Sequence, residues 1–233
     1  IMKTNEIKKM EINGQNLNGL SAKEIGDDHI STSLETPLRV DAFKISDEEK
    51  KSKIALLFEE IMNVMGLDLT DDSLKGTPKR VAKMYIDEIF SGLNPSNKPK
   101  IALFENKYRY NQMLVEKNIT FYSNCEHHFV PIIGKAHLAY ISAGKVIGLS
   151  KLNRIVQYFA KRPQVQERLT NQIANELSKI LGTEDIAVII DAKHLCVSSR
   201  GIKDESSATV TSYYGGVFNE SQKITELQNY INN

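Results

Sequence analysis

Apolar residues in the first half of the chain follow the spacing of two amphipathic helices. The first pattern begins near Glu49, repeats at intervals of three and four residues, and stops at Gly66. Its apolar positions are Ile54, Leu57, Phe58, Ile61, Met62 and Met65. A second helix is predicted from Thr77, as N-cap, with Pro78 in its first turn. Two such helices with a short connection predict a helical hairpin over residues 51–95.

The next part of the chain, residues 96–220, mixes strand and helix patterns. Strands are predicted at 113–122, 132–141, 146–149, 186–191 and 207–214, and helices at 150–161 and 165–181. Residues 193–199 are expected to belong to the strand that partners 186–191. Two helices in series between groups of strands predict an α+β layer, with a sheet on one side and helices on the other.

Both ends of the chain are polar. Residues 1–50 predict a partly flexible N-terminal arm, and residues 221–233 a polar C-terminal tail. No apolar run approaches the roughly 20 residues that a membrane helix needs. The first ten residues contain no apolar signal-peptide core. These patterns predict a cytoplasmic protein without a membrane partner.

The charge of the chain is nearly balanced. Its 233 residues include 30 basic and 29 acidic side chains, which gives a net charge of +1. A nucleic-acid partner is therefore not expected, and any anion site must be local.

Cysteine and histidine gather at two places. Cys125 and His128 are three residues apart, so a tight turn lets a thiolate and an imidazole converge on one ion. Cys196 offers a third ligand from a distant segment. Three such ligands leave one tetrahedral position open, as in catalytic zinc sites. The alternative is two unrelated buried cysteines that act as small apolar residues.

Two further histidines stand beside these candidate ligands. If residues 193–199 form a strand, His194 and Cys196 point to the same face, which suits His194 to proton transfer. His127 is either a second proton-transfer group or a residue that orients the reacting water. The alternative for both is a hydrogen bond that fixes the ligands.

Basic residues concentrate after Gly148. Ser150 and Lys151 begin a predicted helix, where free backbone N–H groups favour an anion, and Arg154 follows one turn later. Together with Arg80 and Arg200 they form a candidate polyphosphate site. The alternative is a solvated basic helix face.

Gln166 and Glu167 begin the long helix predicted after Pro163. A carboxylate there stabilises a helix N-terminus by ~0.3–1 kcal/mol. A glutamate that faces a pocket instead accepts two N–H bonds from a guanine edge. The sequence alone leaves both open.

Five segments resemble the GTP cyclohydrolase I family, and the resemblance extends over residues 35–218. They are TPKRVAKM at 77–84, CEHHFVP at 125–131, GLSKLNR at 148–154, RPQVQERL at 162–169 and RGIKD at 200–204. The resemblance implies the tunnelling fold (T-fold), an antiparallel sheet with helices on one side plus an N-terminal hairpin. It also implies a homodecamer of two pentamers with active sites between subunits.

The same resemblance implies a role for each candidate residue. Zn²⁺ is expected on Cys125, His128 and Cys196, with His194 as the main acid/base and His127 assisting. Glu167 is expected to bind guanine with help from Gln166. The triphosphate or ribose is expected to contact Arg80, Lys151, Arg154 and Arg200, with Ser150 nearby.

The implied reaction is hydrolytic opening of the guanine imidazole ring of GTP at C8, with release of formate. Reclosure then gives 7,8-dihydroneopterin triphosphate, the first step of tetrahydrofolate and pterin biosynthesis. One alternative is a relative on the same fold with a cysteine nucleophile, such as a deazaguanine nitrile reductase. Another is a non-enzymatic scaffold with a Cys125–Cys196 disulfide, which a cytoplasmic location disfavours.

Overall fold

The computed structural model describes residues 11–12, 15–16 and 33–233 of the chain. The chain divides into two compact units, Ile1–Leu34 and Glu35–Asn233. In the first unit, β1 (Glu11–Ile12) and β2 (Gln15–Asn16) pair antiparallel. The predicted flexible arm lies mostly outside the described residues.

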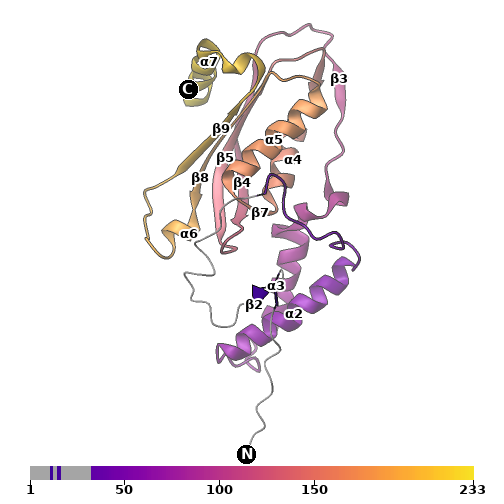
Figure 1. The fold of residues 1–233 in the computed structure, drawn as a ribbon, viewed down its shortest axis with the longest axis vertical. Helices are drawn as coiled ribbons and strands as arrows, with labels where there is room; N and C mark the ends of the chain where they lie inside the picture. Colours follow the sequence, from indigo (N-terminus) through magenta and orange to yellow (C-terminus); the bar gives the residue numbers. More distant parts are fainter. Residues whose placement is uncertain (1–10, 13–14, 17–32) are drawn as a thin grey trace, which may run out of the picture. The chain divides into compact units, whose positions relative to one another are not determined.

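A five-stranded sheet with the order β7-β4-β5-β8-β9 forms the centre of the second unit (Figure 1). Its strands are β4 (Leu114–Cys125), β5 (Pro131–Tyr140), β7 (Pro163–Gln164), β8 (Ile186–His194) and β9 (Thr209–Tyr214). All neighbours are antiparallel except the short pair β4–β7. Outside this sheet, β3 (Leu103–Glu105) pairs with β6 (Lys145–Ile147).

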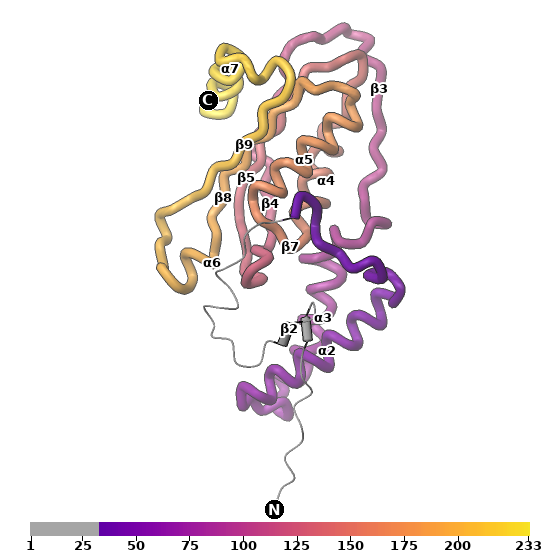
Figure 2. The backbone as a smooth tube through the Cα atoms, in the orientation of Figure 1, coloured from indigo at the N-terminus to yellow at the C-terminus, as the bar shows by residue number. Residues whose placement is uncertain are grey.

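Helices α4 (Leu149–Ala160) and α5 (Gln166–Leu181) pack on one face of this sheet (Figures 1 and 2). Alternate strand residues such as Phe121, Leu138 and Ile190 face them and are fully buried with Leu152 and Ile173. α5 ends at Gly182, whose φ of 65° is the left-handed conformation that glycine adopts freely. The predicted α+β class of the T-fold is confirmed.

The C-terminal segment that we predicted as a polar tail forms helix α7 (Ser221–Asn232). Leu227 is buried, and it packs with Ala139 and Ala187. These alanines alternate with the strand residues that face α4 and α5, so α7 covers the opposite face of the sheet at one end.

The N-terminal hairpin consists of α2 (Asp47–Val64) and α3 (Thr77–Lys83), and the chain continues through η1 (Met84–Ile89), η2 (Ser91–Leu93) and η3 (Pro95–Asn97). Ser46 caps α2, because its Oγ accepts from the backbone N–H of Glu49. Gly76, rather than the predicted Thr77, is the N-cap of α3.

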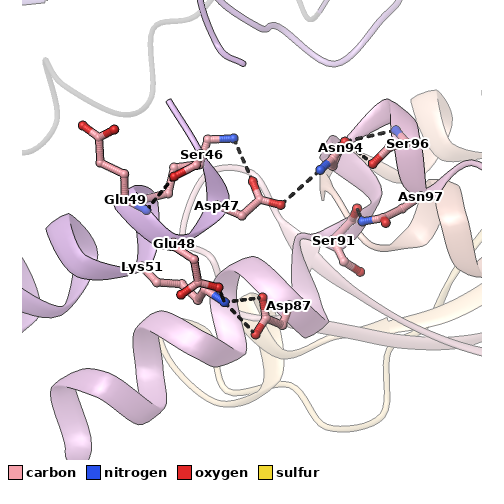
Figure 3. A network of polar contacts seen from close by, with 11 residues as sticks. Ser46, Asp47, Glu48, Glu49, Lys51, Asp87, Ser91, Asn94, Ser96 and Asn97 are labelled. Carbon is pink, nitrogen blue, oxygen red and sulfur yellow. Dashed lines mark hydrogen bonds and ion pairs between the residues drawn. The ribbon is translucent and has the colours of Figure 1, made fainter. Parts of the chain in front are cut away.

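Polar contacts attach α2 to the segment after α3 (Figure 3). Lys51 binds Asp87 in η1, with Nζ 3.2 Å from Oδ1. The Asn94 amide donates to Asp47 at 3.1 Å. None of the helices in the described part of the chain is both long and apolar enough to cross a bilayer.

The apolar face predicted for α2 is only partly covered within one chain, where Ile54 and Phe58 are half-buried. Only Met62 is buried, whereas Leu57, Ile61 and Met65 are 67%, 51% and 69% exposed. The helical period was predicted correctly, and part of this face stays exposed in an isolated chain because α2 packs mainly on α3. Such a face is typical of an interface with another chain.

The buried His137 gives a test of the fold. It lies on β5 with 8% exposure, and its Nδ1 is 3.4 Å from the backbone N of Asn118, at a bulge in β4. Burial lowers the pKa of His137, Asp191 partly opposes this, and Lys135 and Lys117 lower it further. The folded protein therefore holds this histidine neutral.

We predict that His137→Asn reduces the loss of stability at acid pH, since the Asn Oδ1 replaces the Nδ1 acceptor without titrating. As pH falls below about 6.5, the unfolded chain takes up this proton first, and the folded state loses up to about 1.4 kcal/mol per pH unit until its own pKa is reached. Urea unfolding at pH 7.5 and 5.5 measures the effect. Identical pH dependence of both proteins would contradict it.

Candidate active site

The end of β4 forms a tight turn that holds Cys125 and His128 together. The Cys125 N–H donates to the carbonyl of Val130 at 2.9 Å, and the Phe129 N–H donates to the carbonyl of Cys125 at 2.8 Å. Phe129 takes a φ of 54°, which folds the chain back sharply into β5. The predicted convergence of the CxxH pair thus results from this turn.

Cys196 reaches the same place from a different element than predicted. β8 extends through His194, which pairs with Ile132 of β5, and Leu195–Ser198 then forms the short helix α6. The prediction that residues 193–199 are a partner strand was therefore wrong, and His194 and Cys196 do not share a strand face. On the side away from β5, the strand that pairs with β8 is β9, which begins only at Thr209.

The ligand atoms of Cys125, His128 and Cys196 all lie within 4.8 Å of one another. Zinc–ligand distances of roughly 2.0–2.3 Å place tetrahedral donors about 3.5–3.8 Å apart, so a small contraction fits this set to one ion. Two thiols and an imidazole are also the donors that zinc prefers. Both cysteines are free thiols, which does not support the disulfide alternative.

The electrostatics of this cluster are those of partly buried thiols beside a cation. Burial, and then the neighbouring Cys125 thiol, raise the pKa of Cys196, while Arg200 opposes the shift. Arg200 donates from Nη1 to Nε2 of His128 at 3.0 Å. His128 and Arg200 are exposed, so the cluster is open to solvent on this side.

His194 lies two residues before Cys196, and its ring contacts α5. Its Nε2 is 2.7 Å from Oε1 of Gln166, a residue that is 2% exposed. Burial lowers the pKa of His194, and the carboxylate of Glu167 partly opposes this shift. His194 is therefore neutral near pH 7, and Glu167 is close enough to influence it.

His127 is more exposed than His194. Its Nδ1 is 3.6 Å from Sγ of Cys125, and its side chain is 40% exposed. The ring therefore lies beside one candidate ligand and remains accessible from solvent.

The sequence analysis missed an ion pair beside the turn that holds Cys125 and His128. Arg168 of α5 binds both carboxylate oxygens of Glu126, at 2.5 and 3.2 Å, and its side chain is only 2% exposed. The Glu126 N–H also donates to the carbonyl of Gln164 at 3.0 Å. The position of Glu126 between Cys125 and His127 was the available signal, but Arg168 was read as part of a basic stretch.

The predicted anion-binding residues of α4 lie far from this cluster within one chain. Asn153 donates to the Glu116 carboxylate at 3.2 Å and Gln157 to the carbonyl of Thr120 at 2.7 Å, so α4 runs alongside β4. Ser150 and Lys151 are thus near the start of β4. An extended strand from residue 116 to Cys125 spans roughly 30 Å.

Two other predicted anion-binding residues also have local neighbours. Arg154 lines a separate cavity with Asp87 and Lys161. Arg80 lies in α3, and its Nη2 donates to the carbonyl of Ser73 at 2.9 Å and to Oγ1 of Thr77 at 2.8 Å. One chain therefore brings together the metal and proton-transfer residues, with Arg200, but not the whole predicted anion site.

Comparison with known proteins gives the same family as the motifs. A sequence model of GTP cyclohydrolase I matches residues 54–232. GTP cyclohydrolase 1 of Flavobacterium johnsoniae is 64% identical over 208 residues, which are 89% of this chain and 93% of that protein. The Escherichia coli K12 protein of the same name is 56% identical over 193 residues, 83% and 87% of the two chains. That of Salmonella arizonae is 55% identical over 197 residues, 84% and 89%.

Loss of the Glu126 carboxylate should strongly destabilise the protein. Glu126→Gln removes the carboxylate charge that the buried Arg168 guanidinium binds through both oxygens, and breaking a buried ion pair from one side costs about 3 kcal/mol or more. For a chain of this size the expected fall in Tm is about 6–12 °C. Scanning calorimetry of the zinc-loaded protein at fixed concentration measures it.

Glu48→Gln is the matched control, because Glu48 is 85% exposed in its ion pair with Lys51. An exposed pair contributes less than about 1 kcal/mol. Equal shifts of Tm in the two variants would show that burial of Arg168 does not matter.

Proposed function

Because the chain belongs to the GTP cyclohydrolase I family, we propose that it opens the guanine imidazole ring of GTP at C8. Formate leaves, the ribose rearranges, and ring closure gives 7,8-dihydroneopterin triphosphate for tetrahydrofolate or pterin synthesis in the cytoplasm. The observation that carries this proposal is the convergence of three metal-binding side chains within 4.8 Å of one another. The half-buried His194 lies two residues before Cys196 in the chain.

In this proposal Zn²⁺ is held by Cys125, His128 and Cys196. When bound, it supplies a water activated for attack near neutral pH. The cysteine-nucleophile alternative needs one activated thiol, whereas here two thiols and an imidazole converge within 4.8 Å of one another, as a metal site requires. A ligand role therefore suits the pair better than nucleophilic attack.

The proton-transfer and base-binding roles go to residues around α5. His194, whose lowered pKa keeps it able to accept a proton near neutral pH, takes a proton from the attacking water and then gives it to the ring nitrogen that leaves. Glu167 is exposed beside it and binds the N–H groups of guanine. His127 assists from its position 3.6 Å from the Cys125 sulfur.

The triphosphate and ribose are bound by Arg200 together with residues of other subunits. Arg200 is next to His128 in one chain. Ser150 and Lys151 lie near the other end of β4, so GTP on the cluster cannot reach them within one chain. We therefore propose that Ser150, Lys151, Arg154 and Arg80 come from neighbouring copies in a homodecamer of two pentamers. The uncovered apolar face of α2 supports such an assembly.

The metal and acid/base roles are separable by mutation. We expect Cys196→Ser to lose zinc, since one of three protein ligands is gone, and to release no formate. His194→Ala should keep zinc but lose roughly 10²–10⁴-fold in formate release, the usual contribution of general acid–base catalysis. The measurements are elemental zinc, formate, and pterin fluorescence after oxidation, all following incubation with GTP.

The proposal fails if wild-type protein releases no formate from GTP. A fully active His194→Ala variant would remove His194 from the mechanism. A Cys196→Ser variant that still holds one zinc per chain would remove Cys196 from the ligand set.

A shared active site predicts complementation between two inactive variants. We expect co-expressed His194→Ala and Lys151→Ala chains, purified through two different tags, to recover about a quarter of wild-type activity, since random pairing joins two intact halves in about one site of four. Formate release measures the recovery.

The double variant His194→Ala/Lys151→Ala, co-expressed with wild type, is the control and should also give about a quarter. A site contained in one chain would instead give no recovery in the first mixture and about half of the activity in the control.

A further inference from the structure

The amide of Gln166 is held in one orientation by the acceptors around it. Its Nε2 lies 3.1 Å from the carbonyl of Ile190 and 2.8 Å from that of Thr209. Backbone carbonyls only accept hydrogen bonds, so the NH₂ group must occupy this position. Oε1 then faces Nε2 of His194 at 2.7 Å. An amide flip would place an oxygen against two oxygens, which the buried site does not allow.

Two threonine hydroxyls reinforce the same orientation. Thr170 Oγ1 donates to the backbone carbonyl of Gln166 at 2.9 Å and lies 2.7 Å from Oγ1 of Thr211. Since Thr170 has one hydroxyl proton, it must accept from Thr211. Thr211 Oγ1 therefore accepts from the Gln166 amide, at 3.1 Å. The hydrogen bonds therefore run consistently: His194 donates to Oε1 of Gln166, the Gln166 amide donates to Thr211, Thr211 donates to Thr170, and Thr170 donates to the Gln166 carbonyl.

We propose that this network makes Gln166 a positioning residue, which keeps the hydrogen of the His194 ring on Nε2 and leaves Nδ1 to exchange the proton with the substrate. A carbonyl-type oxygen cannot donate, so the ring nitrogen that faces it must carry the hydrogen. In residues 33–233, the His194 ring makes no other hydrogen bond. The inference rests on the proposed role of His194.

This assignment differs from the sequence prediction that Gln166 helps to bind guanine. A guanine-binding amide must present polar atoms to the substrate, whereas Gln166 is 2% exposed and both ends of its amide are engaged. Loss of a guanine contact would raise KM. Loss of a tautomer-fixing contact lowers kcat, because fewer molecules have the reactive nitrogen free.

The first test needs no mutation. Solid-state nitrogen-15 NMR of zinc-loaded, histidine-labelled protein at pH 7.5, without GTP, distinguishes protonated from unprotonated ring nitrogens. The His194 signals are assigned by their loss in His194→Asn. We expect a protonated Nε2 and an unprotonated Nδ1. The reverse pattern would overturn the inference, even in an enzyme that releases formate, whereas failure of the proposed function would appear as absence of formate.

The second test separates kcat from KM. Gln166→Met removes the acceptor but keeps the length of the side chain, and we expect kcat to fall roughly 10²-fold with KM nearly unchanged and the second tautomer visible by NMR. A raised KM with unchanged kcat would overturn the inference in favour of guanine binding.

Thr211→Val and Thr211→Ser keep the test informative if Gln166→Met does not fold. The valine removes the hydroxyl and should lower kcat about tenfold, a part of the effect expected for a positioning contact. The serine restores the hydroxyl and should restore kcat. Equal kcat in Thr211→Val and wild type would exclude the threonines from the network, and a kcat that serine does not rescue would indicate a packing role.

Discussion

The register of β5 between β4 and β8 is the constraint on which the site depends. Asn124 of β4 lies opposite Pro131, and His194 of β8 lies opposite Ile132, the next residue of β5. The carboxyl ends of β4 and β8 therefore meet at the beginning of β5, about 10 Å apart across three strands. The CxxH turn and α6 bridge this distance from the two sides. A slip of one residue in β5 would reverse the facing of every side chain along it.

The sequence predicted the local parts of this arrangement better than the long-range ones. The turn that brings Cys125 close to His128 and the helix that begins at Gln166 both depend on neighbouring residues, and the structure has both. The end of β8 was not, because Leu195, Cys196 and Val197 favour a strand by composition. What ends the strand is that β5 begins at Pro131, opposite Asn124, so β8 has almost no partner beyond His194.

The hairpin shows a different limit of sequence analysis. A period of three and four apolar residues indicates that one face of a helix will be buried, but not which chain buries it. Within one chain, Leu57 and Ile61 of α2 remain more than half exposed. The same limit applies to Lys151, whose position at the start of α4 separates it from Cys125. The exposed part of this face and the separation of Lys151 from Cys125 both support the proposed assembly of several copies.

The geometry of the first turn of α5 explains why three consecutive side chains point in three different directions. Successive side chains on a helix point about 100° apart. Gln166 is directed at His194, Arg168 at Glu126 beneath the metal turn, and Glu167 between them is exposed. Two of these polar side chains are buried, so each needs its partner in place.

The start of α5 is in turn fixed relative to the candidate metal ligands. β7 pairs with the end of β4, and Gln164 lies opposite Cys125 only two residues before the helix begins. A shift of α5 by one residue would therefore break this pair and exchange the directions of residues 166–168. It would also place Val165 or Glu167 against the carbonyls of Ile190 and Thr209, which accept from the Gln166 amide at present. The positions of His194 and of the turn that holds Cys125 and His128 are thus set by the same short parallel pair of strands.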